Sequence, residues 1–507
     1  MGQGKTPDWK VFNRPWYLRL LYTIAGYFKN VGLMLWSVIL AIPRKLKQFG
    51  IAIGKGFYGF GYRFIRGDWR TKISYAIFGF GCLTRGQVLK GLLLLATEAL
   101  FVLYMVFLGA ENLWMMGSLG DVAQIDGDYG TVEVHNSLKI LIFSVLTILL
   151  MLFMLYMWVA NTKIVYAAQK RVQEGKPLAT TKQQINYAFN DGYHVTVLIL
   201  PVLGILIVTV LPLICNILIA FTNYDFFHAP RAHLFDWVGF ESFVNVFSKT
   251  YGNAIWSVLG WTIIWAIFAT FTNFFFGMFL AMVINKKSIK LKAFWRTCFV
   301  IVIAMPDFVT LLMMSQFFSY QPVTAQSGAF NHILQQWFGI NKNIDWFGTT
   351  IANPLRARTM VIVVNLWRGM PFTMLSTYGI LMNIPEELYE SSRIDGAGPV
   401  RRFISITFPY IMFVMGPQLI TTFTGNINNF NVIFFLTGGG PFTRIGGNAP
   451  GTTDLLVTWL YRLTVSSSQP EFSNGAVIGI FTFIISSFFA LIVFNSSKSI
   501  KQEDTFQ

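Results

Sequence analysis

The sequence predicts an all-α integral membrane protein with about eight transmembrane helices, preceded by an interfacial helical region at the N-terminus. Composition supports this fold class, because 54% of the 507 residues are hydrophobic and only 12% are charged. Soluble domains carry about 25% charged residues. The mean hydropathy of +0.53 agrees with this difference. The third observation is a series of apolar runs near the length of about 20 residues that a helix needs to cross a bilayer.

The apolar runs set the expected organisation of the chain. The predicted spans cover residues 91–108, 140–159, 195–221, 255–283, 297–317, 359–382, 411–436 and 475–494. Before them, the apolar segment 31–42 is too short to span and is flanked by Lys29 and Arg44, which predicts an interfacial amphipathic helix. The expected parts are a basic cytoplasmic or interfacial region over 1–86, two helices within 87–194, a six-helix part over 195–495 and a tail over 496–507.

The net charge of +16 indicates how the chain is oriented in the membrane. Lys and Arg accumulate on the cytoplasmic side of bacterial membranes. In this chain they concentrate in alternate segments, at 1–90, 160–194, 284–296, 383–410 and 495–507. Both termini are therefore predicted to be cytoplasmic. The basic surplus is explained by topology and contact with membrane lipid, so nucleic acid is not an expected partner.

The segment 385–409 lies between two predicted spans and carries a helix–turn–helix pattern. Pro385 and the acidic residues after it suit the start of a short helix. Gly396 and Gly398 permit a sharp reversal before a second short helix. Glu390, Ser391 and Ser392, followed by Gly396, have the spacing of the EAA motif, which this segment resembles, with two alanines of the motif replaced by serine. That motif belongs to permease subunits of ATP-driven bacterial importers.

From Phe221 to its end, the chain resembles a narrower group, the MalF-type permease subunits of maltose and maltodextrin importers within the binding-protein-dependent carbohydrate permeases. The matching motifs are FTNYD at 221–225, VGFE at 238–241, NNF at 428–430, GGGP at 438–441 and GTTDLLV at 451–457. The first two recur across carbohydrate importers generally. The last ones point to maltose-type members.

The resemblance implies an ABC importer permease core formed by spans three to eight. This core would pair with a homologous, MalG-like permease around a sugar pathway in the bacterial cell membrane. Glu390, Ser391, Ser392 and Gly396 would dock the loop onto a dimeric cytoplasmic ATPase, and an extracytoplasmic sugar-binding protein would deliver maltose or maltodextrin-type oligosaccharides. The chain would then be a transport subunit without a cofactor, because ATP hydrolysis belongs to a partner chain.

Polar residues in the seventh span are candidates for sugar binding. Thr422, Asn426 and Asn429 follow spacings of four and three, which predicts one helical face. Amides and hydroxyls suit sugar hydroxyls because they offer both donors and acceptors. The resemblance places Asn426 and Asn429 at sugar-lining positions, and it places Gly369 and Phe372 of the sixth span beside the sugar. The alternative for each polar residue is a hydrogen bond that holds two helices together.

Two charged residues in predicted spans depart from the family pattern. Arg368 stands where an apolar residue is expected, and a guanidinium inside a span is functional or paired by default. It is expected either to bind a sugar hydroxyl or to contact a carboxylate such as Asp307. Glu98 in the first span is expected to be neutralised or paired within the bundle.

Other functions are weighed against import of maltodextrins. The same scaffold suits other oligosaccharides, of the galactan or cyclodextrin type. A proton-coupled secondary transporter would use midplane carboxylates as a proton relay. Two candidates, Glu98 and Asp307, are few for that role. A membrane-embedded sugar-transferring enzyme would need paired acidic residues, for which Asp225, Asp236 and Glu241 are candidates. Histidines and cysteines are scattered, so no catalytic or metal-ligating residues are predicted.

Overall fold

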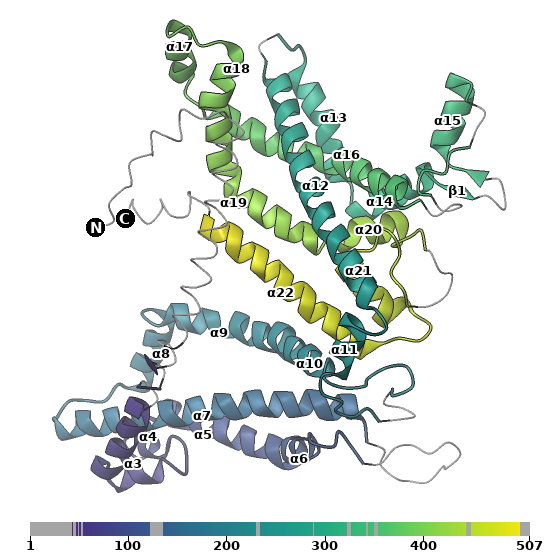
Figure 1. The fold of residues 1–507 in the computed structure, drawn as a ribbon. Coiled ribbons are helices and arrows are strands. Elements are labelled where there is room, and N and C mark those ends of the chain that lie inside the picture. Colours follow the sequence, from purple (N-terminus) through teal and green to yellow (C-terminus); the bar gives the residue numbers. More distant parts are fainter. Residues whose placement is uncertain are drawn as a thin grey trace. The chain divides into compact units, whose positions relative to one another are not determined.

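A computed structural model describes residues 54–121, 135–229, 234–286, 288–321, 326–340, 343–348, 353–442 and 448–496, with a few isolated positions before residue 54. These residues are nearly all helical, as predicted, apart from a two-stranded antiparallel ladder and an isolated bridge between Thr222 and Trp237. The expected interfacial helix at 31–42 lies outside the described residues. The chain forms two compact units, which we describe separately: unit 1 contains residues 1–216 and 230–234, and unit 2 contains residues 217–229 and 235–507 (Figure 1).

Unit 1 contains the first helices of the chain. Before α3, they include a helix over residues 54–66. The further elements are α3 (Trp69–Ile73), α4 (Phe80–Leu83), α5 (Val88–Tyr104), the π-helical turn η1 (Met105–Gly109), α6 (Ala110–Trp114), α7 (Ser137–Gln173), α8 (Thr181–Phe189), α9 (Tyr193–Ile205), the π-helical turn η2 (Leu206–Val210) and most of α10 (Leu211–Ile219).

Polar side chains of α5 and α7 hold the non-helical backbone of unit 1. Asn161 of α7 donates from Nδ2 to the carbonyl of Ser74 (2.6 Å) and accepts at Oδ1 from the amide of Gly79 (3.0 Å). Glu98 of α5 accepts a hydrogen bond from the amide of Phe78 (2.8 Å). Glu98 is therefore hydrogen-bonded within unit 1, and the partner shown is a backbone amide.

Asp68 anchors the start of α3 in the same unit. Its carboxylate accepts from the amide of Thr71 (2.9 Å) and forms an ion pair with Arg85 (2.6 Å). Burial acts to raise the pKa of Asp68, but the hydrogen bonds from Thr71 and Arg85 outweigh it and hold the pKa below its ordinary value. The ionised carboxylate therefore caps the helix.

Unit 2 contains the second half of the chain. Its elements are α11 (Glu241–Phe247), α12 (Gly252–Asn285), α13 (Lys292–Ala304), α14 (Asp307–Phe317), β1 (Tyr320–Gln321), β2 (Gln326–Ser327), α15 (Ala329–Phe338), α16 (Pro354–Met382), α17 (Glu386–Ile394), α18 (Pro399–Arg402), the π-helical turn η3 (Phe403–Thr407), α19 (Phe408–Ile427), α20 (Phe430–Thr437), α21 (Leu456–Tyr461), the π-helical turn η4 (Arg462–Ser466) and α22 (Phe472–Ser496).

Within the described residues, six helices are long and apolar enough to cross a membrane, and the bent pair α13–α14 is a further candidate. The predicted unbroken helix over 297–317 is wrong, because α13 and α14 meet at 96°. Pro306 explains the break. The residue before a proline is disfavoured in the α conformation, and Met305 is extended, with φ −77° and ψ 139°.

The predicted helix over 411–436 is also broken. It ends at Ile427 and resumes as α20 at Phe430. The side chain of Asn429 accepts from the amide of Val432 (3.3 Å) and caps α20. Asn side chains compete with the backbone for such hydrogen bonds and therefore favour helix ends over helix interiors.

Helices α12 and α16 cross closely at the centre of unit 2. A Cβ added to Gly277 of α12 would lie 2.6 Å from the Cβ of Thr373 and 2.9 Å from the carbonyl oxygen of Met370 on α16. Only glycine permits this approach. α16 is long enough to span, at 29 residues, but it is less apolar than the six qualifying helices because several of its polar residues face a cavity.

The glycine-rich segment between α20 and α21 is organised around Asp454. This buried carboxylate accepts from the amide of Gly451 (2.7 Å), from Thr458 Oγ1 (3.0 Å) and from Arg462 Nη2 (2.5 Å). Gly439 has a φ of 89°, and a Cβ there would collide with the Asp454 carboxylate. The GGGP and GTTDLLV motifs therefore meet in space and have a structural role in this segment.

Candidate functional site

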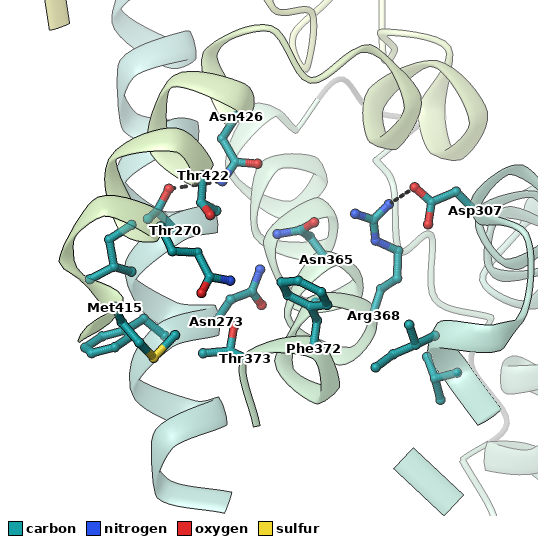
Figure 2. A pocket seen from close by; sticks show the side chains of 16 residues that line it. Thr270, Asn273, Asp307, Asn365, Arg368, Phe372, Thr373, Met415, Thr422 and Asn426 are labelled. Carbon is teal, nitrogen blue, oxygen red and sulfur yellow. Dashed lines mark hydrogen bonds and ion pairs between the residues drawn. The ribbon is translucent and has the colours of Figure 1, made fainter. Parts of the chain in front are cut away.

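A cavity of about 280 Å³ lies among α12, α13, α14, α16 and α19 of unit 2 (Figure 2). It is at the small end of the volumes of ligand pockets. Its lining residues are Thr270, Asn273, Phe274, Val302, Ile303, Asp307, Asn365, Arg368, Gly369, Phe372, Thr373, Met415, Gln418, Leu419, Thr422 and Asn426. Amides, hydroxyls and two aromatic rings, Phe274 and Phe372, thus share a single space, a combination suited to a ligand with many hydroxyl groups.

The structure brings most of the predicted sugar-site residues together. Gly369, Phe372, Thr422 and Asn426 all line the cavity. Asn429 is not among the lining residues. The predicted single helical face is wrong for Asn429 because the helix ends before it.

Asn429 instead contacts a residue that lines the cavity. Its Nδ2 donates to Oδ1 of Asn426 (3.1 Å), and Nδ2 of Asn426 donates to Thr270 Oγ1 (3.0 Å). The Asn426 amide is therefore fixed at both ends, by the cap of α20 and by α12. Asn429 acts on the cavity by orienting Asn426.

Gly369 allows α12 and α16 to approach beside the cavity. A Cβ added to Gly369 would lie 2.8 Å from Cγ of Asn273 on α12. Asn273 itself lines the cavity, so a larger residue at 369 would push that amide out of place. The exposed ring of Phe372 lies one turn further along α16, at the centre of the view in Figure 2.

Sequence reasoning missed the amides and hydroxyls that reach the cavity from other positions. Asn365 is 2% exposed, and neither its Nδ2 nor Oδ1 of Asn273 has a hydrogen-bond partner among the described residues. Buried polar atoms without partners are rare in native proteins. The sequence does contain a pattern that indicates Asn365 as a lining residue. Asn365, Arg368 and Phe372 follow spacings of three and four within a predicted span and so share one helical face.

Arg368 and Asp307 contact each other across the cavity wall. Arg368 Nη1 donates to Asp307 Oδ2 at 2.8 Å, and Figure 2 shows the guanidinium reaching from α16 to the start of α14. The expected contact between these two side chains is therefore confirmed. Among the described residues that line the cavity, Asp307 is the one acidic side chain.

The predicted docking loop forms a helical pair at the start of α19 (Figure 1). Gly396 has a φ of 73°, the left-handed conformation expected of the turn. Gly398 does not adopt the left-handed conformation, since its φ is −68°. The predicted second short helix does not end as a separate helix, because α18 continues through η3 into α19. Tyr389 and Thr407 join the two arms through their hydroxyls (2.9 Å).

The four predicted docking residues occupy different places in this pair. Glu390 and Ser391 are exposed on α17, Ser392 Oγ donates back to the carbonyl of Tyr389 (2.8 Å), and Gly396 forms the turn. The large apolar side chains of Leu388, Ile394 and Val400 are also exposed on the pair. Such a surface is typical of a protein contact.

The part of the chain that the structure describes holds no group of three or more His, Cys, Asp or Glu residues that could hold a metal ion. Its three cysteines are free.

Comparison with known proteins identifies the family. Residues 273–498 match the model of the binding-protein-dependent transport system inner membrane component. The chain is 35% identical over 427 residues to the galactooligosaccharides transport system permease protein GanP of Bacillus subtilis (strain 168), covering 84% of this chain and 96% of that protein. This chain belongs to the binding-protein-dependent transport permeases. It is thus a multi-pass permease subunit of an ABC importer in the cell membrane, and a transport subunit rather than an enzyme.

Two further relatives lie within the same permease family. The maltodextrin transport system permease protein MalC of Streptococcus pneumoniae serotype 4 (strain ATCC BAA-334 / TIGR4) is 34% identical over 430 residues, or 84% of this chain and 95% of that protein. The maltose/maltodextrin transport system permease protein MalF of Escherichia coli (strain K12) is 32% identical over 263 residues, or 51% of this chain and 49% of that protein. The resemblance to MalF-type permeases is confirmed.

Proposed function

We propose that this permease carries neutral oligosaccharides of the maltodextrin type through the cavity between α12, α14, α16 and α19. The observation that supports the proposal is the lining itself, where Asn365, Thr422 and Asn426 offer hydrogen bonds around the exposed ring of Phe372. A ring beneath a sugar provides apolar stacking area. Amide and hydroxyl groups can donate to and accept from sugar hydroxyls.

The second part of the proposal concerns energy coupling. Unit 2 would pair with a homologous, MalG-like permease, and Glu390, Ser391, Ser392 and Gly396 would dock the α17–α18 pair onto a dimeric cytoplasmic ATPase. An extracytoplasmic binding protein would supply the sugar. This arrangement places both termini in the cytoplasm. Its support is the exposed Glu390 and the exposed apolar side chains beside it.

A related cargo is the second candidate. One relative is named for galactooligosaccharides and another for maltodextrins, at nearly equal identity. Galactan-type oligosaccharides are therefore the alternative cargo to maltodextrins. Proton-coupled transport has less support, because Asp307 is the cavity's one acidic residue and it is already paired with Arg368.

The test is ATPase activity of the complex reconstituted in lipid with its partner permease, ATPase and binding protein. We expect stimulation when the binding protein is loaded with maltose, maltotriose or a galactooligosaccharide, and the most effective sugar identifies the cargo. Glu390→Ala should abolish stimulation and leave sugar loading of the binding protein unchanged. Glu387→Ala, an exposed acidic residue on the same helix, is the matched control. Full stimulation of the Glu390→Ala complex would contradict the docking role.

A further inference from the structure

The ion pair between Arg368 and Asp307 is poorly explained as a structural contact. The Asp307 side chain is 51% exposed and that of Arg368 is 21% exposed, and both line the cavity. Ion pairs that are open to water contribute little to folding stability. Structural Arg–carboxylate pairs are frequently bidentate, whereas these side chains share a single hydrogen bond, from Nη1 to Oδ2.

The single contact leaves hydrogen-bonding groups unused on both residues. Among the described residues, Nε and Nη2 of Arg368 and Oδ1 of Asp307 have no hydrogen-bond partner, and both side chains are open to water, at 21% and 51% exposure. A guanidinium can only donate and a carboxylate can only accept. Donors and an acceptor therefore lie side by side at the wall of the cavity.

We propose that Arg368 and Asp307 form a subsite that binds two neighbouring hydroxyl groups of a neutral sugar. One hydroxyl donates to Oδ1 of Asp307, and its neighbour accepts from the free guanidinium N–H groups of Arg368. The subsite rests on the proposed function and defines which part of the cargo the permease recognises. Phe372 lies four residues beyond Arg368 on the same face of α16, so a ring stacked on Phe372 presents its edge to the pair.

The charges of the pair also select against another class of sugar. Arg368 and Asp307 together are neutral, so a neutral diol satisfies both residues. A carboxylate of a sugar acid could accept from Arg368 but has no proton to donate to Oδ1 of Asp307, whereas a neutral diol supplies both a donor and an acceptor. The expected cargo is therefore a neutral oligosaccharide with an unmodified pair of adjacent hydroxyls.

The test uses the full complex reconstituted in lipid and the oligosaccharide that best stimulates the wild type. The probes are versions of that sugar in which one ring hydroxyl is replaced by hydrogen. Only versions that the binding protein still holds, by separate titration, are used. In the wild type, at least one deoxy sugar should be transported about 10- to 100-fold more slowly, as expected for losing a hydrogen bond to a charged group.

Variants of the pair separate recognition from structure. Arg368→Leu should transport the parent sugar as slowly as the wild type transports the deoxy sugar, and it should no longer distinguish the two. Asp307→Asn, which keeps the size of the side chain, should reduce the discrimination in the same way. The control is Arg356→Leu on the same helix, outside the cavity lining, where the guanidinium donates to the carbonyl of Asp345 (3.1 Å). It should keep the full discrimination.

The possible results decide between the two proposals. If the wild type is stimulated by loaded binding protein but both variants discriminate against the deoxy sugar as strongly as the wild type does, the subsite is refuted and the importer stands. Wild-type rates on the parent sugar in both variants would refute it too. If Arg368→Leu fails to assemble, Asp307→Asn decides. If no oligosaccharide stimulates the wild type, the proposed function fails, and the subsite fails with it.

Discussion

Replacing Asn365 by leucine should stabilise the permease and impair transport at the same time. Asn365 is 2% exposed on α16, and its Nδ2 has no hydrogen-bond partner among the described residues. A buried polar group without a partner costs about 1–3 kcal/mol of folding stability. Leucine has a similar volume and no polar atom, so Asn365→Leu should recover about this amount.

Asn331, a buried asparagine with a full set of hydrogen bonds, is the matched comparison for this prediction. Asn331 of α15 is 1% exposed, and its side chain is fully engaged: Nδ2 donates to the carbonyl of Ile344 (3.0 Å), and Oδ1 accepts from the amide of Ile344 (3.3 Å) and from Trp346 Nε1 (3.0 Å). Asn331→Leu leaves three partners unsatisfied at about 1 kcal/mol or more each. The same substitution should therefore change stability in opposite directions at the two sites.

The assay is thermal unfolding of the purified complex, combined with transport in lipid vesicles. One kcal/mol corresponds to about 2–4 °C in domains of about 150–250 residues and to less in larger proteins, so Asn365→Leu should raise the melting temperature by about one degree or more and Asn331→Leu should lower it. Transport by Asn365→Leu should fall about tenfold or more, because a hydrogen bond to the sugar is lost. A lower melting temperature with unchanged transport would refute the reasoning and show that Asn365 is held by the protein itself.

Three other substitutions test the fold of the two units, two of them in unit 2 and one in unit 1. Gly277→Ala should force α12 and α16 apart and destabilise the complex by about 1–3 kcal/mol in thermal unfolding, whereas Gly260→Ala, with nothing within 4 Å on the same helix, should not. Asp454→Ala should cost about 3–5 kcal/mol, because it removes a buried carboxylate and leaves the partly buried Arg462 without its ion pair; a wild-type melting temperature would contradict this. Burial acts to raise the pKa of Asp68, but hydrogen bonding outweighs burial and lowers this pKa in the folded state. The stability that this carboxylate adds should be full above its ordinary pKa of 3.8 and lost as the pH falls further, so the gap in melting temperature between wild type and Asp68→Asn should close in acid.

Much of the fold follows from the sequence because burial in lipid leaves a strong compositional signal. The candidate spans fall where the long apolar runs predict them, and the turn at Gly396 follows from the need for a positive φ. The break at Pro306 was also visible in principle, since proline disfavours helix in the residue before it. Apolar composition alone conceals such breaks, because both halves of a broken helix are equally apolar.

The cavity is less predictable, because its walls come from segments far apart in the chain. The spacing of Thr422, Asn426 and Asn429 predicts one helical face, but a spacing argument holds only while the helix continues. Here the Asn429 side chain caps the next helix, and that hydrogen bond removes it from the face it was expected to share. Thr270 supplies the partner of Asn426 from a helix more than 150 residues earlier, with |i−j| of 156. No local pattern contains that contact. It depends on the crossing of α12 with α16 and α19, which small residues such as Gly277 permit, so the arrangement of polar groups around the cavity is determined by helix packing as much as by the polar residues themselves.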